Sequence, residues 1–187
     1  MSKRLVYLNE FNIRMGKVCY LPFVSGLLRA YAESWAMIHD NYKFATFIYR
    51  TDNLENVMAL YDAPPNVAAF SISVWNEQLS LAVAAEIKSR WPDCLTIFGG
   101  PQVPQKPRDY LTAYPFIDIA VRGEGEEPFA DILHRHLESQ DFSGIPQVAF
   151  RSENGEIQAN PCEYPFKKEL DYLPSPLDIP AVLAVNP

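Results

Sequence analysis

The stretch "IAVRGEGEEPF" (residues 119–129) passes from an apolar segment through a glycine-rich loop into a segment with helical periodicity. Its apolar beginning suits a buried strand, and the apolar residues after Pro128 recur at the spacing of an amphipathic helix. Proline is tolerated in the first turn of a helix. In the loop, two glycines alternate with glutamates, and glycine permits positive φ angles and a close approach of the backbone to a ligand. The stretch therefore predicts a strand, a ligand-facing loop and a helix.

The same alternation of strand and helix precedes this unit along the chain. The strand-like segments are residues 4–10, 43–50, 67–75, 94–100 and 116–123. The helix-like segments are residues 20–35, 53–62, 77–91 (with Asn76 as the cap), 107–114 and 126–139. Five strands alternating with five helices predict an α/β fold with a flavodoxin-like, doubly wound, mostly parallel five-stranded sheet.

The character of the sequence changes after residue 140. Residues 147–160 read as two short strands around Asn154 and Gly155, which is a hairpin signal, and we expect this hairpin to add an edge to the sheet. From residue 161 onward, six of the 16 prolines favour extended backbone. We therefore expect a domain over residues 1–140, a hairpin extension over 141–160 and a proline-rich linker over 161–187. Because "AVLAVNP" (181–187) reads as the start of another strand, we expect the chain to be the front part of a longer protein.

Composition excludes several classes of function. The formal net charge of −7 and the sequence pI near 5.0 leave no basic surface for a nucleic-acid backbone. The first apolar stretch is too short for a signal peptide or a membrane span, so we expect a cytoplasmic location without membrane contact. The three cysteines have neither CxxC nor CxxxCxxC spacing, and the sequence contains no Walker loop and no GxGxxG.

Ligands of open parallel sheets bind outside the carboxyl ends of the strands, so the residues at those ends are the site candidates. They are Asn12, Ile13 and Gly16 for the first strand; Ser71, Ser73, Trp75 and Asn76 for the third; Gly99, Gly100 and Pro101 for the fourth; Gly123, Glu124 and Gly125 for the fifth. Many of them are small, which suits a large, flat ligand. Glu126 and Glu127 need no ligand, because carboxylates in a first helical turn favourably meet the positive end of the helix dipole.

Three motifs in this order and spacing resemble a known family: "SISVWN" (71–76), "IFGGPQVP" (97–104) and "DIAVRGEGEEPFADIL" (118–133). They look like the N-terminal cobalamin (B12)-binding domain of B12-dependent radical S-adenosylmethionine (SAM) enzymes. The resemblance covers roughly residues 4–140.

The resemblance implies a domain that lays the corrin ring of cobalamin against the strand ends and inserts the nucleotide tail into the sheet edge. By position, Ser71 and Ser73 would line the slot for the tail. Gly99 and Gly100 would let the tail pass close to the backbone, and the loop 123–125 would lie beside it with Glu124 as a polar contact. The first loop would face the lower side of the corrin.

The first loop departs from the DxHxxG motif of cobalamin domains in mutases and methionine synthase. Alignment on Gly16 puts Phe11 and Ile13 where the aspartate and the cobalt-binding histidine would be. The resemblance therefore implies cobalt without a histidine ligand from the protein.

The resemblance also implies a module that is not catalytic by itself. Its parent enzyme would bind a [4Fe-4S] cluster and SAM on a C-terminal radical SAM barrel, and would be a methyltransferase or a radical rearrangement enzyme. The alternative is a non-enzymatic regulatory or binding domain that keeps the fold without cobalamin. A free-standing hydrolase is disfavoured, because the serine-rich strand end lacks a nucleophile elbow and a histidine to serve it.

Overall fold

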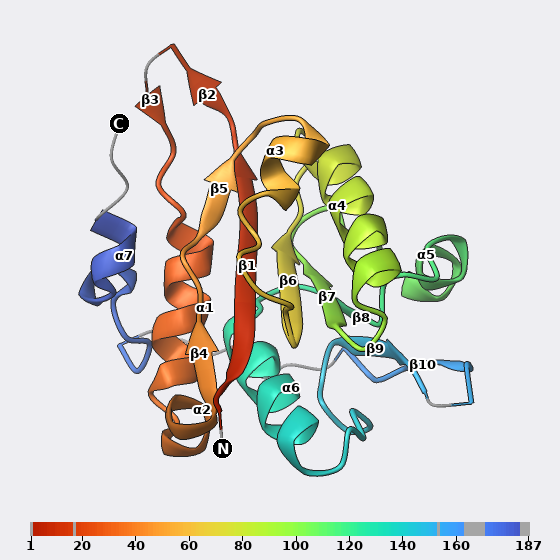
Figure 1. Cartoon of the computed structure of the whole chain (residues 1–187). Helices are drawn as coiled ribbons and strands as arrows, with labels where there is room; N and C mark the ends of the chain where they lie inside the picture. Colours follow the sequence, from red (N-terminus) through yellow and green to blue (C-terminus); the bar gives the residue numbers. More distant parts are fainter. Residues whose placement is uncertain (1, 17, 153, 163–170, 184–187) are drawn as a thin grey trace.

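An open, mostly parallel sheet forms the centre of the computed structural model, which describes residues 2–16, 18–152, 154–162 and 171–183 (Figure 1). Its strands are β1 (Arg4–Asn12), β4 (Tyr42–Phe44), β5 (Ile48–Arg50), β6 (Val67–Ser71), β7 (Leu95–Gly99), β8 (Ile119–Val121), β9 (Val148–Arg151) and β10 (Ile157–Ala159). The strand order is β10-β9-β8-β7-β6-β1-β4, and β5 also pairs with β1. The neighbours from β4 and β5 through to β8 are parallel, whereas β9 and β10 join the β8 edge antiparallel.

This topology confirms the flavodoxin-like fold class and the sheet edge that the hairpin adds. Within the described residues the sheet has eight strands instead of the expected five. The hairpin contributes two of the extra strands. The third arises because the expected strand over 43–50 is two strands, β4 and β5, which pair with successive parts of β1, and the β1–β5 pairing contains a register shift.

Helices cover both faces of the sheet. They are α1 (Phe23–Glu33), α2 (Ala36–Asn41), α3 (Leu54–Met58), α4 (Glu77–Arg90), α5 (Pro107–Ala113) and α6 (Glu126–Glu138). Buried residues of α1, α2 and α6 form one core cluster with Val6 and Leu8 of β1, and those of α3, α4 and α5 form another with Tyr7 and Phe11. Because side chains alternate between the two faces of a strand, β1 supplies both cores and the sheet is doubly wound.

The first strand is longer than its sequence pattern indicates. β1 continues to Asn12, and β2 (Arg14–Met15) and β3 (Val18–Cys19) then form a small hairpin that projects past the sheet (Figure 1). The strand predicted over residues 4–10 therefore ends two residues too early. Asn9, Glu10 and Asn12 are buried in the strand and hydrogen-bonded.

The C-terminal part of the described chain folds back onto α1. Residues 176–178 form a 3-10 helix, η1 (Pro176–Asp178), and α7 (Pro180–Leu183) follows it, with Ile179 and Val182 buried in the core that contains α1. The prediction of an extended linker is wrong here, as is the strand expected to start at residue 181. Residues 163–170 and 184–187 of that expected linker lie outside the described residues.

Gly26 makes this packing possible. A Cβ atom at Gly26 would lie 2.5 Å from Cγ2 of Val182 and 3.1 Å from Cβ of Pro176. The segment 171–183 therefore lies against α1 at a distance that only glycine allows at this position.

Gly26→Ala should displace the segment from α1. Overpacking of this kind costs about 1–3 kcal/mol, more than the gain of about 1 kcal/mol from helix propensity. We expect a lower free energy of unfolding in urea and faster hydrogen exchange at the Val182 amide, which donates to Ile179 O at 2.9 Å. The double variant Gly26→Ala/Val182→Ala should lose less than the sum of the single losses, because it removes the clashing methyl. Unchanged stability and exchange in Gly26→Ala would contradict this packing.

Candidate functional site

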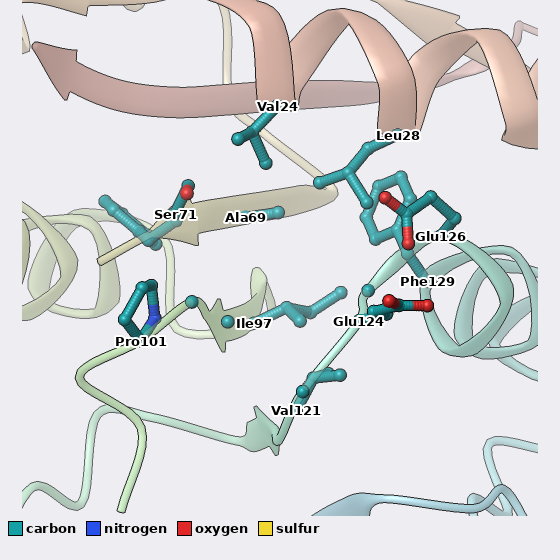
Figure 2. A pocket seen from close by; sticks show the side chains of 15 residues that line it. Val24, Leu28, Ala69, Ser71, Ile97, Pro101, Val121, Glu124, Glu126 and Phe129 are labelled. Carbon is teal, nitrogen blue, oxygen red and sulfur yellow. The ribbon is translucent and has the colours of Figure 1, made fainter. Parts of the chain in front are cut away.

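A cavity of about 210 Å³ opens at the carboxyl ends of β6, β7 and β8, between α1 and α6 (Figure 2). Its floor is apolar: Ala69, Ile97 and Val121 come from three neighbouring strands, and Ala69 and Ile97 are direct partners in the sheet. Val24 and Leu28, one helical turn apart on α1, form one wall, and Phe129 of α6 lies across from them. The cavity is thus a slot between two helices over the ends of three parallel strands.

Two glycines shape this slot in different ways. A Cβ atom at Gly99 would meet only Val121 Cβ, at 3.9 Å, so the missing side chain there leaves open space. A Cβ atom at Gly125 would lie 3.3 Å from Cδ2 of Leu28, so glycine lets the loop approach α1.

Gly100 also lines the cavity, but the backbone itself requires glycine at this position. Its φ is +107°, and a Cβ atom would lie 2.5 Å from the carbonyl oxygen of Ile72. The same Ile72 donates its amide to Gly99 O at 2.7 Å. Gly100 therefore lets the chain turn tightly against the end of β6.

The loop 122–125 is held from the side of the antiparallel extension. Arg122 is buried and donates through Nε to Gln147 O at 3.1 Å and through Nη2 to Asn160 O at 2.6 Å. The side-chain amide of Gln147, oriented with its nitrogen toward the loop, donates to Glu124 O at 3.1 Å. These bonds connect the extension to the loop that lines the cavity.

Two carboxylates lie at one end of the slot, from Glu124 and Glu126 (Figure 2). Burial raises the pKa of Glu126 above its ordinary value, and the negative charge of Glu124 adds to the effect. Hydrogen bonds from the backbone at Gly125 and Glu126 oppose the shift. The site is therefore apolar along its length and acidic at one end.

The structure brings together seven of the expected site residues. The cavity is lined by Ser71, Gly99, Gly100, Pro101, Gly123, Glu124 and Gly125. The other six do not line it: Asn12, Ile13, Gly16, Ser73, Trp75 and Asn76.

Ser73 and Asn76 shape the loop after β6. The Asn76 side chain accepts from Ser73 N at 2.7 Å and donates to Phe11 O at 3.1 Å and Ser71 O at 3.0 Å. Asn76 occupies the N-cap position of α4, but its side chain makes no hydrogen bond to that helix, so the expected side-chain cap is wrong. Instead, it joins the ends of β1 and β6.

Several large apolar side chains are exposed in the segments that follow β1 and β6, two neighbouring strands. They are Ile13, Tyr20, Leu21, Phe23, Val24, Val74 and Trp75. Val74 is 74% exposed and Trp75 is 53% exposed, so these side chains face solvent in the isolated chain. Gly16 lies in the β2–β3 turn with φ +62°. The carboxyl edge of the sheet therefore offers apolar surface outside the cavity.

The sequence reasoning missed the helix walls and the floor. The missed lining residues are Val24, Leu28, Ala69, Phe70, Ile97, Val121, Glu126 and Phe129. Val24 and Leu28 are one turn apart in the helix predicted over residues 20–35, but a pattern within one helix does not identify the element that it faces. The floor could have been predicted in part, because Ala69 is two residues before Ser71 on β6 and therefore lies on the same face of the strand.

Histidine and metal sites are absent from this region. None of the three histidines (39, 134 and 136) lines the cavity. Over residues 2–16, 18–152, 154–162 and 171–183, no group of three His, Cys, Asp or Glu residues could hold a metal ion. Within the same residues, no helix is both long enough and apolar enough to cross a membrane.

The raised pKa of Glu126 predicts a pH-dependent cost to folding. The folded chain holds this proton more tightly than the unfolded chain, so stability falls as the pH rises from the ordinary value of 4.5 through the raised value. Glu126→Gln removes this ionisation. We expect a higher Tm than wild type at pH 7, with the difference shrinking as the pH falls below 4.5.

Glu55→Gln is the matched control for this comparison. Glu55 also lies in the first turn of a helix, α3, but it is exposed. Its replacement should leave the Tm unchanged or slightly lower at pH 7, because it removes only a favourable interaction with the helix dipole. A lower Tm for Glu126→Gln than for wild type at pH 7 would contradict the argument.

Comparison with known proteins identifies proteins that are similar to this chain. Residues 42–133 match the family model of the B12 binding domain. The chain is 35% identical over 163 residues to 2-(S-pantetheinyl)-carbapenam-3-carboxylate methyltransferase of Streptantibioticus cattleyicolor, which covers 87% of this chain and 23% of that protein. It is 35% identical over 133 residues to the cobalamin-dependent radical SAM methyltransferase TokK of Streptomyces tokunonensis, covering 71% of this chain and 19% of that one. The chain thus spans less than a quarter of these relatives.

Solved structures share the fold. The cobalamin-dependent SAM radical enzyme OxsB, with aqua-cobalamin and SAM bound, matches with a TM-score of 0.72 at 19% identity, over 97% of this chain and 25% of that chain. The radical SAM methyltransferase TsrM from Kitasatospora setae, with cobalamin and a [4Fe-4S] cluster bound, matches with a TM-score of 0.65 at 17% identity, over 89% of this chain and 30% of that chain. The chain therefore contains a match to the B12 binding domain over residues 42–133, resembles the two methyltransferases in sequence, and shares its fold with the cobalamin-bound radical SAM enzymes.

Proposed function

We propose that this chain binds cobalamin, with the nucleotide tail in the cavity between α1 and α6 and the corrin ring over the carboxyl edge of the sheet. The observation that carries the proposal is the slot itself. It is lined mainly by apolar and small residues at the strand ends, where ligands of open parallel sheets bind.

The lining of the slot fits the tail. An aromatic base in this slot would bury its apolar surface between Leu28 and Phe129. Below it would lie Ala69, Ile97 and Val121. Burial of apolar surface stabilises binding by about 25 cal/mol per Å². Polar contacts to the rest of the tail would come from the Ser71 hydroxyl and from the loop 123–125, including the Glu124 carboxylate.

The remaining expected site residues would serve the corrin side. Ile13 and Trp75 are exposed apolar side chains after β1 and β6, and a flat macrocycle would cover such surface. Asn12, Gly16, Ser73 and Asn76 would act by shaping the segments that carry these side chains.

When bound, cobalamin supplies a cobalt centre that can carry a methyl group, while the protein positions the group and excludes water from it. No histidine lines the cavity or occurs in the sequence from residue 13 to residue 22, between β1 and α1. We therefore propose that the protein supplies an apolar lower face, without histidine ligation of cobalt.

We further propose that the chain is the cobalamin module of a larger radical SAM enzyme, a methyltransferase or a radical rearrangement enzyme. The parent would hold a [4Fe-4S] cluster and SAM on a barrel C-terminal to this domain, and would work in the cytoplasm. Support comes from the two methyltransferases that share 35% identity with this chain and extend well beyond it.

The binding proposal is tested by incubating the purified chain with hydroxocobalamin, removing the excess and recording the visible absorption spectrum. We expect retained corrin bands at positions that indicate a detached lower base. Absence of the chromophore from both this chain and the longer protein that contains it would overturn the proposal, and would favour a domain that keeps the fold without cobalamin.

A cavity-filling substitution tests where the tail binds. Gly99→Val adds a side chain where only Val121 lies within 4 Å of the new Cβ, so the fold should tolerate it. We expect the dissociation constant for hydroxocobalamin to rise about tenfold or more, since overpacking costs about 1–3 kcal/mol. The measurement is an absorption titration of the folded variant.

Ala159→Val is the control for Gly99→Val. It adds a β-branched side chain at an exposed position of β10, away from the cavity, and should leave the affinity at the wild-type value. Wild-type affinity in Gly99→Val would place the tail elsewhere.

The coding sequence downstream of residue 187 tests the role in a larger enzyme. A CxxxCxxC motif within the next few dozen codons would support the radical SAM parent, because that spacing holds the cluster. A stop codon there would overturn the proposed parent and leave cobalamin binding to be judged by the spectrum alone.

A further inference from the structure

We propose that Glu10, which is not among the residues that line the cavity, is a positioning residue for the cobalamin site. Its carboxylate holds the start of α1, and through Asn12 it holds the segment 20–21 in the place that the cofactor requires. This inference rests on the proposed function.

The first step of the argument is the contact between β1 and α1. Glu10 is 7% exposed, and its Oε2 accepts a hydrogen bond from the backbone amide of Ser25 at 2.8 Å. The N-cap residue of α1 is Pro22, which makes no side-chain cap, and the first turn contains no acidic residue. The exposed amides at the start of a helix need an acceptor, and a carboxylate there also meets the positive end of the dipole. Glu10, on the neighbouring strand β1, supplies both the acceptor and the negative charge.

The second step leads from Glu10 to the segment before α1. The other carboxylate oxygen of Glu10 accepts from Nδ2 of Asn12 at 3.1 Å. The same Nδ2 lies 3.4 Å from Tyr20 O and 3.3 Å from Leu21 O, to which it also donates. Glu10 therefore fixes the orientation of the amide that holds the segment 20–21.

The third step connects this network to the site. Val24 lines the cavity and immediately precedes Ser25, whose amide Glu10 holds, and Leu28 follows one turn later on the same face. Tyr20 and Leu21, whose carbonyls Asn12 holds, belong to the exposed apolar surface at the carboxyl edge. One buried carboxylate thus positions a wall of the slot and part of the surface beside it.

The chemistry at Glu10 requires an acceptor at both oxygens. Burial raises the pKa of Glu10, while the bonds from Ser25 and Asn12 oppose the shift by favouring the charged form. Glutamine has nearly the same shape, but its NH₂ group would face one of the two donors. Glu10→Gln should therefore break one branch of the network while leaving the strand in place.

The test compares Glu10→Gln with Asp118→Asn, a matched exchange of a carboxylate for an amide. Asp118 is partly buried and accepts from Thr96 N at 2.8 Å and from Lys88 Nζ at 2.7 Å, but it precedes β8 and does not line the cavity. Tm, the dissociation constant for hydroxocobalamin and the spectrum of bound cobalamin are measured for both variants. Both should lower the Tm: Asp118→Asn loses the ion pair with Lys88, and in Glu10→Gln the donor that faces the new NH₂ group loses its acceptor, which outweighs the removal of the buried charge.

Only Glu10→Gln should weaken cobalamin binding, by about tenfold, the factor that corresponds to one net hydrogen bond to a charged group. Its spectrum of bound cobalamin should also shift, because the surface beside the corrin moves. Asn12→Ala keeps the bond from Ser25 to Glu10 and cuts only the branch to Tyr20 and Leu21. Asn12→Ala should therefore lose less affinity for hydroxocobalamin than Glu10→Gln. It also provides a test of the inference if Glu10→Gln does not fold.

The outcomes separate this inference from the proposed function. If wild type retains no cobalamin, the proposed function fails and this inference fails with it. If wild type binds, but Glu10→Gln and Asn12→Ala bind with unchanged affinity and spectrum, the positioning role is overturned and cobalamin binding stands. The positioning role would also be overturned if Glu10→Gln and Asp118→Asn lost affinity in the same proportion to their loss of Tm. That result would show that Glu10 has a purely structural role.

Discussion

Parallel pairing of β6, β7 and β8 is the constraint on which the site depends. Because these strands run in the same direction, their carboxyl ends meet at one edge, and Ser71 is the direct partner of Gly99. Because α6 begins at Glu126, shortly after β8 ends at Val121, the start of this helix lies beside the same edge. A slot bounded by strand ends below and by helices on both sides follows from this connectivity, provided that the residues at the ends are small.

The glycines near this slot show that small residues serve different purposes. Gly100 satisfies the backbone, since its φ of +107° and the nearby carbonyl of Ile72 exclude a side chain whatever binds there. Gly99 has no such constraint and leaves space that a ligand can fill. Gly26 lies outside the slot and admits the segment 171–183 against α1. The sequence does not distinguish these three roles, because it shows only that a glycine occurs in or next to a predicted strand or helix.

The sequence predicted the parallel core and the strand-end half of the cavity, because hydrophobic periodicity locates strand ends and topology brings them together. It did not predict that β1 continues to Asn12, since the sequence does not show the buried hydrogen bonds of Glu10 and Asn12. Nor did it predict η1 and α7. High proline content indicated extended backbone, but Pro176 and Pro180 occupy the first positions of short helices, where proline fits well. The wall formed by Val24 and Leu28 depends on which face α1 turns to the sheet, which is decided by tertiary packing.

Helix α1 connects these features. One side of it forms the cavity wall through Leu28, another side packs against Val182 through Gly26, and its first turn is held by Glu10. A shift of α1 would therefore change both the width of the slot and the surface on which the segment 171–183 packs. Because coupling between two sites is reciprocal, a ligand that favours one position of α1 would also stabilise the segment that packs on its outer side. The helix that forms a wall of the cavity is thus also the element on which the segment 171–183 packs.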